Sequence, residues 1–219
     1  DPPQLVSDGS GGAVIIWRDF RGGADYDIYA QRINASGAVQ WTADGAAICT
    51  AAGFQTDPQL VSDGSGGAVI TWQDLRSINW DIYAQRINAS GLVQWTADGA
   101  AVCTAADDQR YSQLVSDGSG GAVITWEDLR GAATTDIYAQ RIDVSGAVQW
   151  TADGVTVSTA ANSQSFLEII LADVCRFIIT WQDFRGGATY DIYAHGIDCN
   201  GNLLPVELLS FSKEGIEII

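Results

Sequence analysis

Short apolar runs separated by glycine-rich polar segments are the main pattern along this chain. The run AVIIW at 13–17 is continuous and rich in β-branched residues, which is typical of a strand buried on both faces. DIYAQRI at 27–33 is a further candidate strand, and a NASG hairpin signal follows it at 34–37. No window shows a helical period with capping residues. The pattern therefore predicts an all-β chain with almost no helix.

These candidate strands recur at a fixed interval. The run QLVSDGSGGAVI occurs unchanged at 4–15, 59–70 and 113–124, and DIYAQRI or DIYAHGI occurs four times. Spacings of 54 or 55 residues separate the members of two tryptophan series, Trp17, Trp72, Trp126 and Trp181, and Trp41, Trp95 and Trp150. The chain therefore consists of four tandem repeats. Their approximate bounds are 1–56, 57–110, 111–164 and 165–219.

Each repeat predicts four antiparallel strands. A short QLVSD strand precedes a glycine turn, the GAVIIW and DIYAQRI strands follow, and the AVQW and AAICT runs supply a fourth strand that TADG interrupts. Such a unit of about 55 residues buries both faces only by stacking on other copies, and closing the stack removes its exposed ends. We therefore expect a single all-β domain over residues 1–219, a four-bladed β-propeller. An open β-solenoid or a pair of β-sandwiches is the alternative.

The fourth repeat departs from the other three. Residues 171–181, LADVCRFIITW, replace the SDGSGGAVITW pattern, and no tryptophan corresponds to Trp41. A last repeat that caps the array or faces a partner would change in this way, and so would a repeat under simple sequence drift. Residues 203–219 are expected either to close the ring, with 206–211 as a strand of the first blade, or to begin a linker.

Composition and charge narrow the range of partners. Acidic residues outnumber basic ones by 27 to 11, which gives a formal net charge of −16 at pH 7. Such a field repels nucleic-acid phosphates and anionic membrane surfaces, so we expect no nucleic acid as a partner. No stretch approaches the roughly 18 apolar residues that a membrane helix needs, so we expect no membrane insertion. The charge is compatible with a glycan, a protein ligand or another copy of the chain.

The most repeated polar pattern is W-x-D-x-R followed by D-I-Y. Its Asp–Arg pair would tether a loop or bridge two blades, because the Arg fork matches a carboxylate. Four copies at one end of a ring would also bind a glycan or a protein. Calcium is a third interpretation, which the nearby Arg weakens, so no cofactor is expected. The candidate binding residues are Asp19, Arg21, Asp27, Asp74, Arg76, Asp81, Asp128, Arg130, Asp136, Asp183, Arg185 and Asp191.

Residues that break the repeat are the remaining candidates. Trp80 occurs in one repeat only, in the loop SINWD, and is expected to be an exposed binding residue. His195 is the only histidine and replaces a strand glutamine, which makes it a poor general base. Cys175 and Cys199 fall in two turns of one blade and are compatible with a disulfide. Cys49 and Cys103 are expected to stay apart as small buried side chains.

The pattern SDGSGGAVITW, DIYAQRI and a later tryptophan resembles the β-propeller repeats of large secreted bacterial proteins, over about residues 1–200. The run INASGAVQW also resembles a shortened tryptophan-docking motif of quinoprotein propellers, in which a Trp staples neighbouring blades. The run LPVELLSF at 204–211 resembles a linker in proteins that Bacteroidota and their relatives export by the type IX route. These resemblances imply an extracellular or cell-surface location.

The sequence offers no evident catalytic constellation. Because no base, nucleophile or metal cluster stands out, no enzyme activity is expected. The first hypothesis is a non-enzymatic extracellular module for binding or adhesion, with a glycan among its ligands. The second is a structural subunit that self-assembles into a surface array or filament, which the low lysine content and the apolar residues 203–219 would suit.

Overall fold

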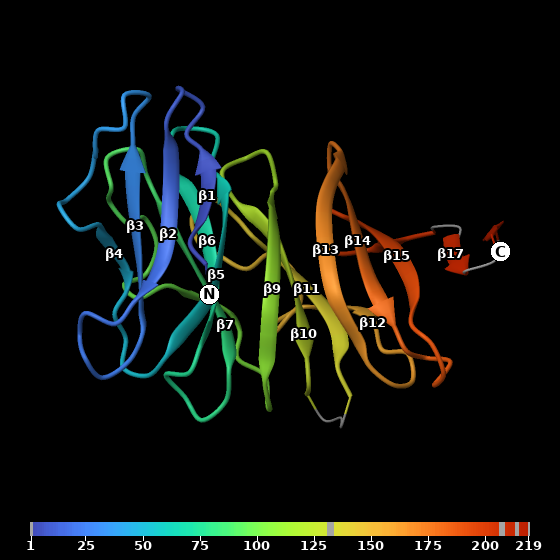
Figure 1. Ribbon diagram of the computed structural model, residues 1–219. Coiled ribbons are helices and arrows are strands. Elements are labelled where there is room, and N and C mark those ends of the chain that lie inside the picture. Colours follow the sequence, from blue (N-terminus) through green and yellow to red (C-terminus); the bar gives the residue numbers. More distant parts are fainter. Residues whose placement is uncertain (1, 131–133, 206–208, 213–214, 219) are drawn as a thin grey trace.

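The computed structural model describes residues 2–130, 134–205, 209–212 and 215–218, and every regular element in these ranges is a strand (Figure 1). Within them no helix has the length and apolar character needed to cross a membrane. The strands are β1 (Gln4–Ser7), β2 (Ala13–Asp19), β3 (Asp27–Ile33), β4 (Ala46–Cys49), β5 (Gln55–Ser62), β6 (Ala68–Asp74), β7 (Asp81–Ile87), β8 (Ala100–Cys103), β9 (Gln109–Ser116), β10 (Ala122–Asp128), β11 (Asp136–Ile142), β12 (Val155–Ser158), β13 (Gln164–Asp173), β14 (Arg176–Asp183), β15 (Asp191–Asp198), β16 (Leu203–Leu204), β17 (Leu209–Ser212) and β18 (Gly215–Ile218).

Four antiparallel sheets correspond to the four repeats. Blade 1 has the strand order β1-β2-β3-β4, and blades 2 and 3 repeat it with β5 to β8 and β9 to β12. Blade 4 begins in the same way with β13, β14 and β15, after which β16 and β17 both pair with β15. The prediction of an all-β chain of four β-propeller blades is confirmed.

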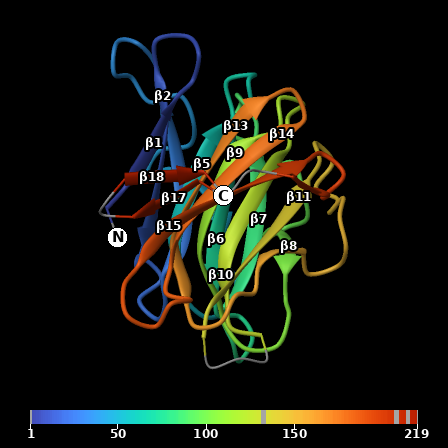
Figure 2. The ribbon, with the colours of Figure 1, turned by 90° about the vertical axis from the view of Figure 1, so that its right-hand side faces the viewer.

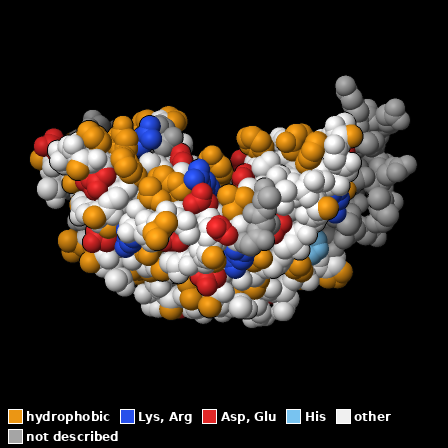
Figure 3. Space-filling view, turned by 90° about the horizontal axis from the view of Figure 1, so that it is seen from below, with side chains coloured by type: hydrophobic (Ala, Val, Ile, Leu, Met, Phe, Trp, Pro, Cys, Tyr) orange, Lys and Arg blue, Asp and Glu red, His pale blue; other side chains and the backbone are white. Residues whose placement is uncertain are grey.

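The blades stand side by side in a curved row. Blade 1 and blade 4 lie at opposite ends of this row, with blades 2 and 3 between them (Figures 1 and 2). The first strand of each blade contacts the first strand of the next, so β1, β5, β9 and β13 run along the same side of the molecule. Seen from below, the molecule is hollowed on one side (Figure 3).

The hydrophobic cores lie between neighbouring blades. The central strands β6 and β10 are buried along their whole length, because each of their faces packs on another blade. One core joins Ile16 and Ile28 of blade 1 to Ile70 and Trp72 of blade 2, and equivalent cores join blade 2 to blade 3 and blade 3 to blade 4. The continuous apolar runs of the second strands thus have two faces to fill.

A tryptophan fastens each blade to the next. The indole of Trp41 is 8% exposed, and its N–H donates to the Ala89 carbonyl of blade 2 at 3.0 Å. Gly91, at φ +79°, lies flat against this ring, where an added Cβ would approach Cγ of Trp41 to 2.6 Å. The contact repeats with Trp95 on Val144 and Gly146, and with Trp150 on Cys199 and Gly201.

Two strands differ in length from the sequence-based prediction. The fourth strand contains only the AAIC-type run, because the TADG turn leaves the sheet and Val39 forms just an isolated bridge to Ile33. The first strand is longer in blade 2, where β5 starts four residues before Gln59 and passes through a bulge between Thr56 and Gln59. A bulge interrupts the alternation on which strand prediction depends.

The C-terminal strands pair within blade 4. β17 bonds to β15 through the pair Ile192 and Phe211, and β18 bonds to β17. These pairings place the described part of 203–219 at the β15 edge of blade 4 and away from β1 (Figure 1). Residues 206–208, 213–214 and 219, which belong to the expected ring-closing strand or linker, lie outside the described residues.

Candidate functional site

In blade 2 the W-x-D-x-R motif forms a closed network. The Trp72 indole N–H donates to the Asp74 carboxylate at 2.8 Å, and the Arg76 guanidinium donates to the same oxygen at 2.6 Å. Arg76 also lies over the Tyr83 ring, 3.8 Å from its centroid, and donates to the Asp98 carbonyl at 2.6 Å. The loop is therefore fixed to its own sheet and to the TADG turn of the same blade.

The network also spans the boundary between blades. Arg76 donates to Sγ of Cys49, which ends β4 of blade 1, at 3.3 Å. Arg130 contacts Cys103 in the same way at 3.2 Å. Across the first boundary the Thr50 amide donates to the Asp98 carboxylate at 2.9 Å. Burial raises the pKa of both cysteine thiols to about 12, so they stay neutral. These contacts are those of a tether between blades.

The four copies of the motif stay separate. Each contains one ion pair, Arg21–Asp19 at 2.5 Å, Arg76–Asp74 at 2.6 Å, Arg130–Asp128 at 2.5 Å and Arg185–Asp183 at 2.6 Å. Among the described residues, no hydrogen bond or ion pair joins one copy to another. Each of these ion pairs thus lies within its own copy, and the role of the four copies in ligand binding stays a prediction.

The aspartates that open the third strands lie opposite the motif aspartates. They are Asp27, Asp81, Asp136 and Asp191, each the register partner of the aspartate that ends the second strand. Burial raises the pKa of the carboxyls of Asp27, Asp81 and Asp136. In the part of the chain that the structure describes, no three His, Cys, Asp or Glu side chains come together as metal ligands, and calcium binding stays a prediction.

Trp80 is half-buried, whereas an exposed side chain was expected. Its amide donates to the Asp108 carboxylate at 3.0 Å, and its carbonyl accepts the Gln109 amide at 2.7 Å. The Arg110 guanidinium lies 5.6 Å from its ring centroid. Trp80 therefore connects the loop of blade 2 to the first strand of blade 3. The fully accessible apolar side chain of that loop is Ile78, which is 94% exposed.

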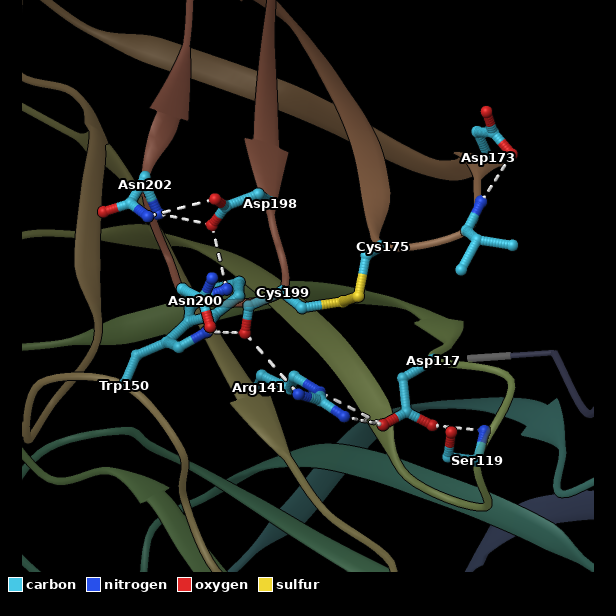
Figure 4. The surroundings of a disulfide bond; sticks show 11 residues. Asp117, Ser119, Arg141, Trp150, Asp173, Cys175, Asp198, Cys199, Asn200 and Asn202 are labelled. Carbon is cyan, nitrogen blue, oxygen red and sulfur yellow. Dashed lines mark hydrogen bonds and ion pairs between the residues drawn. A yellow bond between two sulfur atoms is a disulfide. The ribbon is translucent and has the colours of Figure 1, made fainter.

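The structure contains one disulfide. Cys175, in the turn between β13 and β14, is bonded to Cys199, which follows β15, and the two Cα atoms are 4.9 Å apart (Figure 4). The Cys199 carbonyl accepts the Trp150 indole N–H at 2.8 Å, so the bridge lies beside a contact that joins blades 3 and 4. Cys49 and Cys103 are free and buried.

The first strands of the blades carry an unusual backbone position at their bulges. Asp57, Tyr111 and Phe166 occupy equivalent places in β5, β9 and β13, with φ between +50° and +54°. This left-handed region costs a residue other than glycine about 1 kcal/mol or more. The Tyr111 and Phe166 side chains are 54% and 74% exposed. Two aromatic rings are thus presented to solvent from adjacent blades by a strained backbone.

Glu127 lies beside these rings. Its carboxylate accepts the Phe166 amide at 2.9 Å, just as the side-chain oxygen of Gln73 accepts the Tyr111 amide at 3.2 Å one blade earlier. Glu127 is 9% exposed. Burial raises the pKa of its carboxyl, and the hydrogen bond from Phe166 only partly opposes that shift. A buried carboxyl therefore stands at a position where the preceding repeat has an amide.

A pocket of about 390 Å³ opens between β9 and β13, and its walls combine carboxyls with aromatic rings. Glu127 and Glu168 are its two acids, and Tyr111 and Phe166 are its two aromatic residues. An adjoining pocket of about 260 Å³ shares Tyr111 and Glu127 and adds Arg110. Such a site can hold a neutral cyclic ligand against the aromatic side chains and exchange a proton with it through a carboxyl.

Sequence reasoning missed this pocket because, among the positions that differ between repeats, it considered Trp80, His195 and the cysteines but not the second residue of W-x-D-x-R. The signal was the variable residue of W-x-D-x-R, which is Arg18, Gln73, Glu127 and Gln182 in turn. The bulge residues vary in the same way. Glu127 and Phe166, which differ in chemistry from their counterparts Gln73 and Asp57, both line the pocket.

Comparisons with known proteins place the fold. No family model matches the chain. No curated protein matches it in sequence. Solved structures do match. The endo-arabinase of Bacteroides thetaiotaomicron aligns at a TM-score of 0.52 and 14% identity, over 97% of this chain and 75% of its own. The GH93 α-L-arabinofuranosidase of Fusarium graminearum aligns at a TM-score of 0.55 and 12% identity, over 92% of this chain and 64% of its own. A thermostable family-43 glycoside hydrolase aligns at a TM-score of 0.54 and 11% identity, over 96% of this chain and 71% of its own.

At these identities the likeness shows a shared β-propeller fold. The named neighbours are glycan-degrading enzymes. This finding contradicts the expectation that the chain is a non-enzymatic adhesion module, and with it the alternative of a self-assembling structural subunit. That expectation rested on the lack of an evident base, nucleophile or metal cluster in the sequence.

Proposed function

We propose that this protein hydrolyses glycosidic bonds of a polysaccharide at the pocket between β9 and β13. One observation carries the proposal. Glu127 is a buried carboxyl with a raised pKa, and it lines the pocket together with a second carboxyl, Glu168. Glycoside hydrolysis needs one acid that stays protonated to donate to the leaving oxygen, and one ionised carboxylate.

In this proposal the two carboxyls have different roles. Glu127 donates its proton to the glycosidic oxygen as the bond to the sugar carbon breaks, because burial keeps its carboxyl protonated to higher pH. Glu168 is exposed, and as the ionised carboxylate it accepts a proton from the water whose oxygen bonds to that sugar carbon in place of the leaving oxygen. Tyr111 and Phe166 stack on sugar rings, which present apolar faces to aromatic side chains.

The substrate class follows from the same pocket and from the neighbours. Two apolar rings and few cationic groups suit a neutral polysaccharide, which the chain's negative charge does not repel. Among the structural neighbours are an endo-arabinase and a xylanase, so arabinan and xylan are the first substrates to test. We place the protein outside the cell, because a disulfide such as Cys175–Cys199 persists in oxidising compartments.

The test is hydrolysis of arabinan and xylan by the full chain and by Glu127→Gln. Loss of the proton donor should lower kcat by about 10²-fold to 10⁴-fold. Wild-type activity should also fall as pH rises through the raised pKa of Glu127, because the ionised form has no proton to donate. The fold should survive, because Gln73 makes the equivalent hydrogen bond to Tyr111. Equal rates for wild type and variant, or no hydrolysis by either, would refute the proposal.

A further inference from the structure

Blade 1 exposes a sheet face that every other blade buries. The face consists of Leu5, Ala13, Ile15, Trp17 and Ile33, and we call it the blade 1 end face. Leu5 is 67% exposed, and the other four side chains are half-buried. Of their counterparts in blade 2, Ala68, Ile70, Trp72 and Ile87 are 0% exposed, and Leu60, which corresponds to Leu5, is half-buried. The same side chains therefore form half of an interblade core in blades 2 and 3 and no such core in blade 1.

The ion pair of the W-x-D-x-R motif is also more exposed to solvent at this face. In blade 2 the Asp74 side chain is 0% exposed and its partner Arg76 is 23% exposed, beneath Cys49 of the preceding blade. In the equivalent ion pair of blade 1, the Asp19 side chain is 17% exposed and the Arg21 side chain is 38% exposed. In blade 2 the preceding blade covers this ion pair through Cys49, and among the described residues no side chain covers the pair of blade 1 in the same way.

The position that receives a docking tryptophan is ready-made in blade 1. Gly37 has φ +81°, close to the +79° of Gly91, and its added Cβ would meet nothing within 4 Å. The neighbouring Ala35 carbonyl corresponds to Ala89, which accepts the Trp41 indole. Among the described residues, no donor reaches the Ala35 carbonyl. The turn thus has the shape of the three occupied receptors while holding no ring.

A second copy of the chain cannot fill this receptor in the same way. Trp41, Trp95 and Trp150 are each 8% exposed, and each indole N–H already donates to the next blade. Blade 4 has Pro205 at the equivalent position, seven residues after Asp198 as Trp150 is seven after Asp143. The chain therefore has three indoles for three internal receptors and a fourth receptor left over.

We propose that the blade 1 end face binds a further β-blade that presents a tryptophan to Gly37 and the Ala35 carbonyl. The occupant is a four-stranded blade of this repeat type, with an indole at the position of Trp41 and an apolar face that covers Leu5, Ile15 and Trp17. Three internal interfaces built from the same residues supply its geometry. Contiguous apolar surface of this kind marks an interaction site.

The test adds such a blade to the full chain. A copy of residues 57–110 is placed directly ahead of Pro2, which keeps the repeat spacing, and accessibility is read from a Leu5→Cys thiol. Maleimide should label this thiol rapidly in the unextended chain and at least about tenfold more slowly when the added blade covers it. Ile78→Cys, on an exposed loop far from the face, is the matched control and should label equally fast in both chains.

A variant of the added blade separates indole docking from simple apolar contact. In this variant the docking tryptophan, which is the copy of Trp95, is replaced by Ala. Its protection of Leu5→Cys should be mostly lost. Continued protection of Cys49 and Cys103, which are buried, verifies that each chain is folded. Unchanged labelling of Leu5→Cys in the extended chain overturns the proposal, and so does full protection by the Ala variant. Protection in the unextended chain that rises with its concentration would show instead that a second copy is the occupant.

Discussion

Single residues in this protein are best understood by comparison with their counterparts in other repeats. Gln73 and Glu127 hold equivalent backbone amides, yet only Glu127 brings a titratable group to the pocket. Gly37 and Gly91 share a left-handed backbone, yet only Gly91 contacts a tryptophan. Such pairs allow a local backbone requirement to be separated from a packing requirement within the same molecule.

The glycine pair gives the first prediction. Gly91→Ala should lower the free energy of unfolding by about 3 kcal/mol or more, because it adds a clash with Trp41 to the left-handed strain. Gly37→Ala, at nearly the same φ, should cost about 1 kcal/mol, since its Cβ enters open space. Urea unfolding of the two variants measures the difference. Equal losses would show that the backbone angle alone matters and that the Trp41 contact is loose.

At the scale of elements, the W-x-D-x-R loop ties its strand to the rest of the fold. The aspartate that ends the second strand accepts an indole, a backbone amide and a guanidinium in blade 2. Its arginine reaches both the TADG turn and the preceding blade. The repetition of this pattern therefore reflects a structural requirement at each blade boundary.

Replacing this aspartate should have unequal effects along the chain. Asp74→Asn leaves the guanidinium of Arg76 without its anion at a covered boundary and should cost about 3 kcal/mol or more of unfolding free energy. Asp19→Asn removes the same pair at the open face of blade 1, where water screens it, and should cost about 1 kcal/mol or less. Thermal or urea unfolding decides between these values. A loss from Asp19→Asn as large as that from Asp74→Asn would mean that the blade 1 end face is covered.

At the scale of the whole molecule, each blade is stabilised mainly by its contacts with the neighbouring blades in the row. Each blade buries its second and third strands against its neighbours, so the end blades have fewer stabilising contacts than the middle ones. Blade 4 lacks the glycine turn of the other blades and instead carries the Cys175–Cys199 bridge across its first and third strands. The covalent bond lies where one of the three tryptophan contacts ends.

Reduction of this bridge should therefore loosen blade 4. The bond joins residues 24 apart, and its loss should cost about 3 kcal/mol. For a chain of this size that cost corresponds to a fall in Tm of about 6 to 12 °C. A double variant, Cys175→Ser with Cys199→Ser, should show the same fall without reductant and no further change with it. An unchanged Tm in both samples would mean that blade 4 is stable without the bridge.

Much of the fold follows from particular runs in the sequence. The apolar run AVIIW at 13–17 predicted a strand buried on both faces; its counterparts β6 and β10 are such strands, whereas β2 itself is half-buried on one face. Four copies of the strand pattern predicted four blades. The shortened fourth strand and the lengthened first strand were not predicted, because a turn and a bulge depend on what the neighbouring blade allows the backbone to do.

The sequence by itself determined the repeat, and with it the four blades, because strand periodicity and turn residues are local properties. It could not place the pocket, since Glu127 comes from one repeat and Phe166 and Glu168 come from the next, and the packing of β13 on β9 and β10 brings these repeats together. Nor could it show that the three docking tryptophans are all engaged while the receptor at Gly37 is open. Burial, which raises the pKa of Glu127 and separates an occupied face from an open one, is a property of the tertiary structure alone.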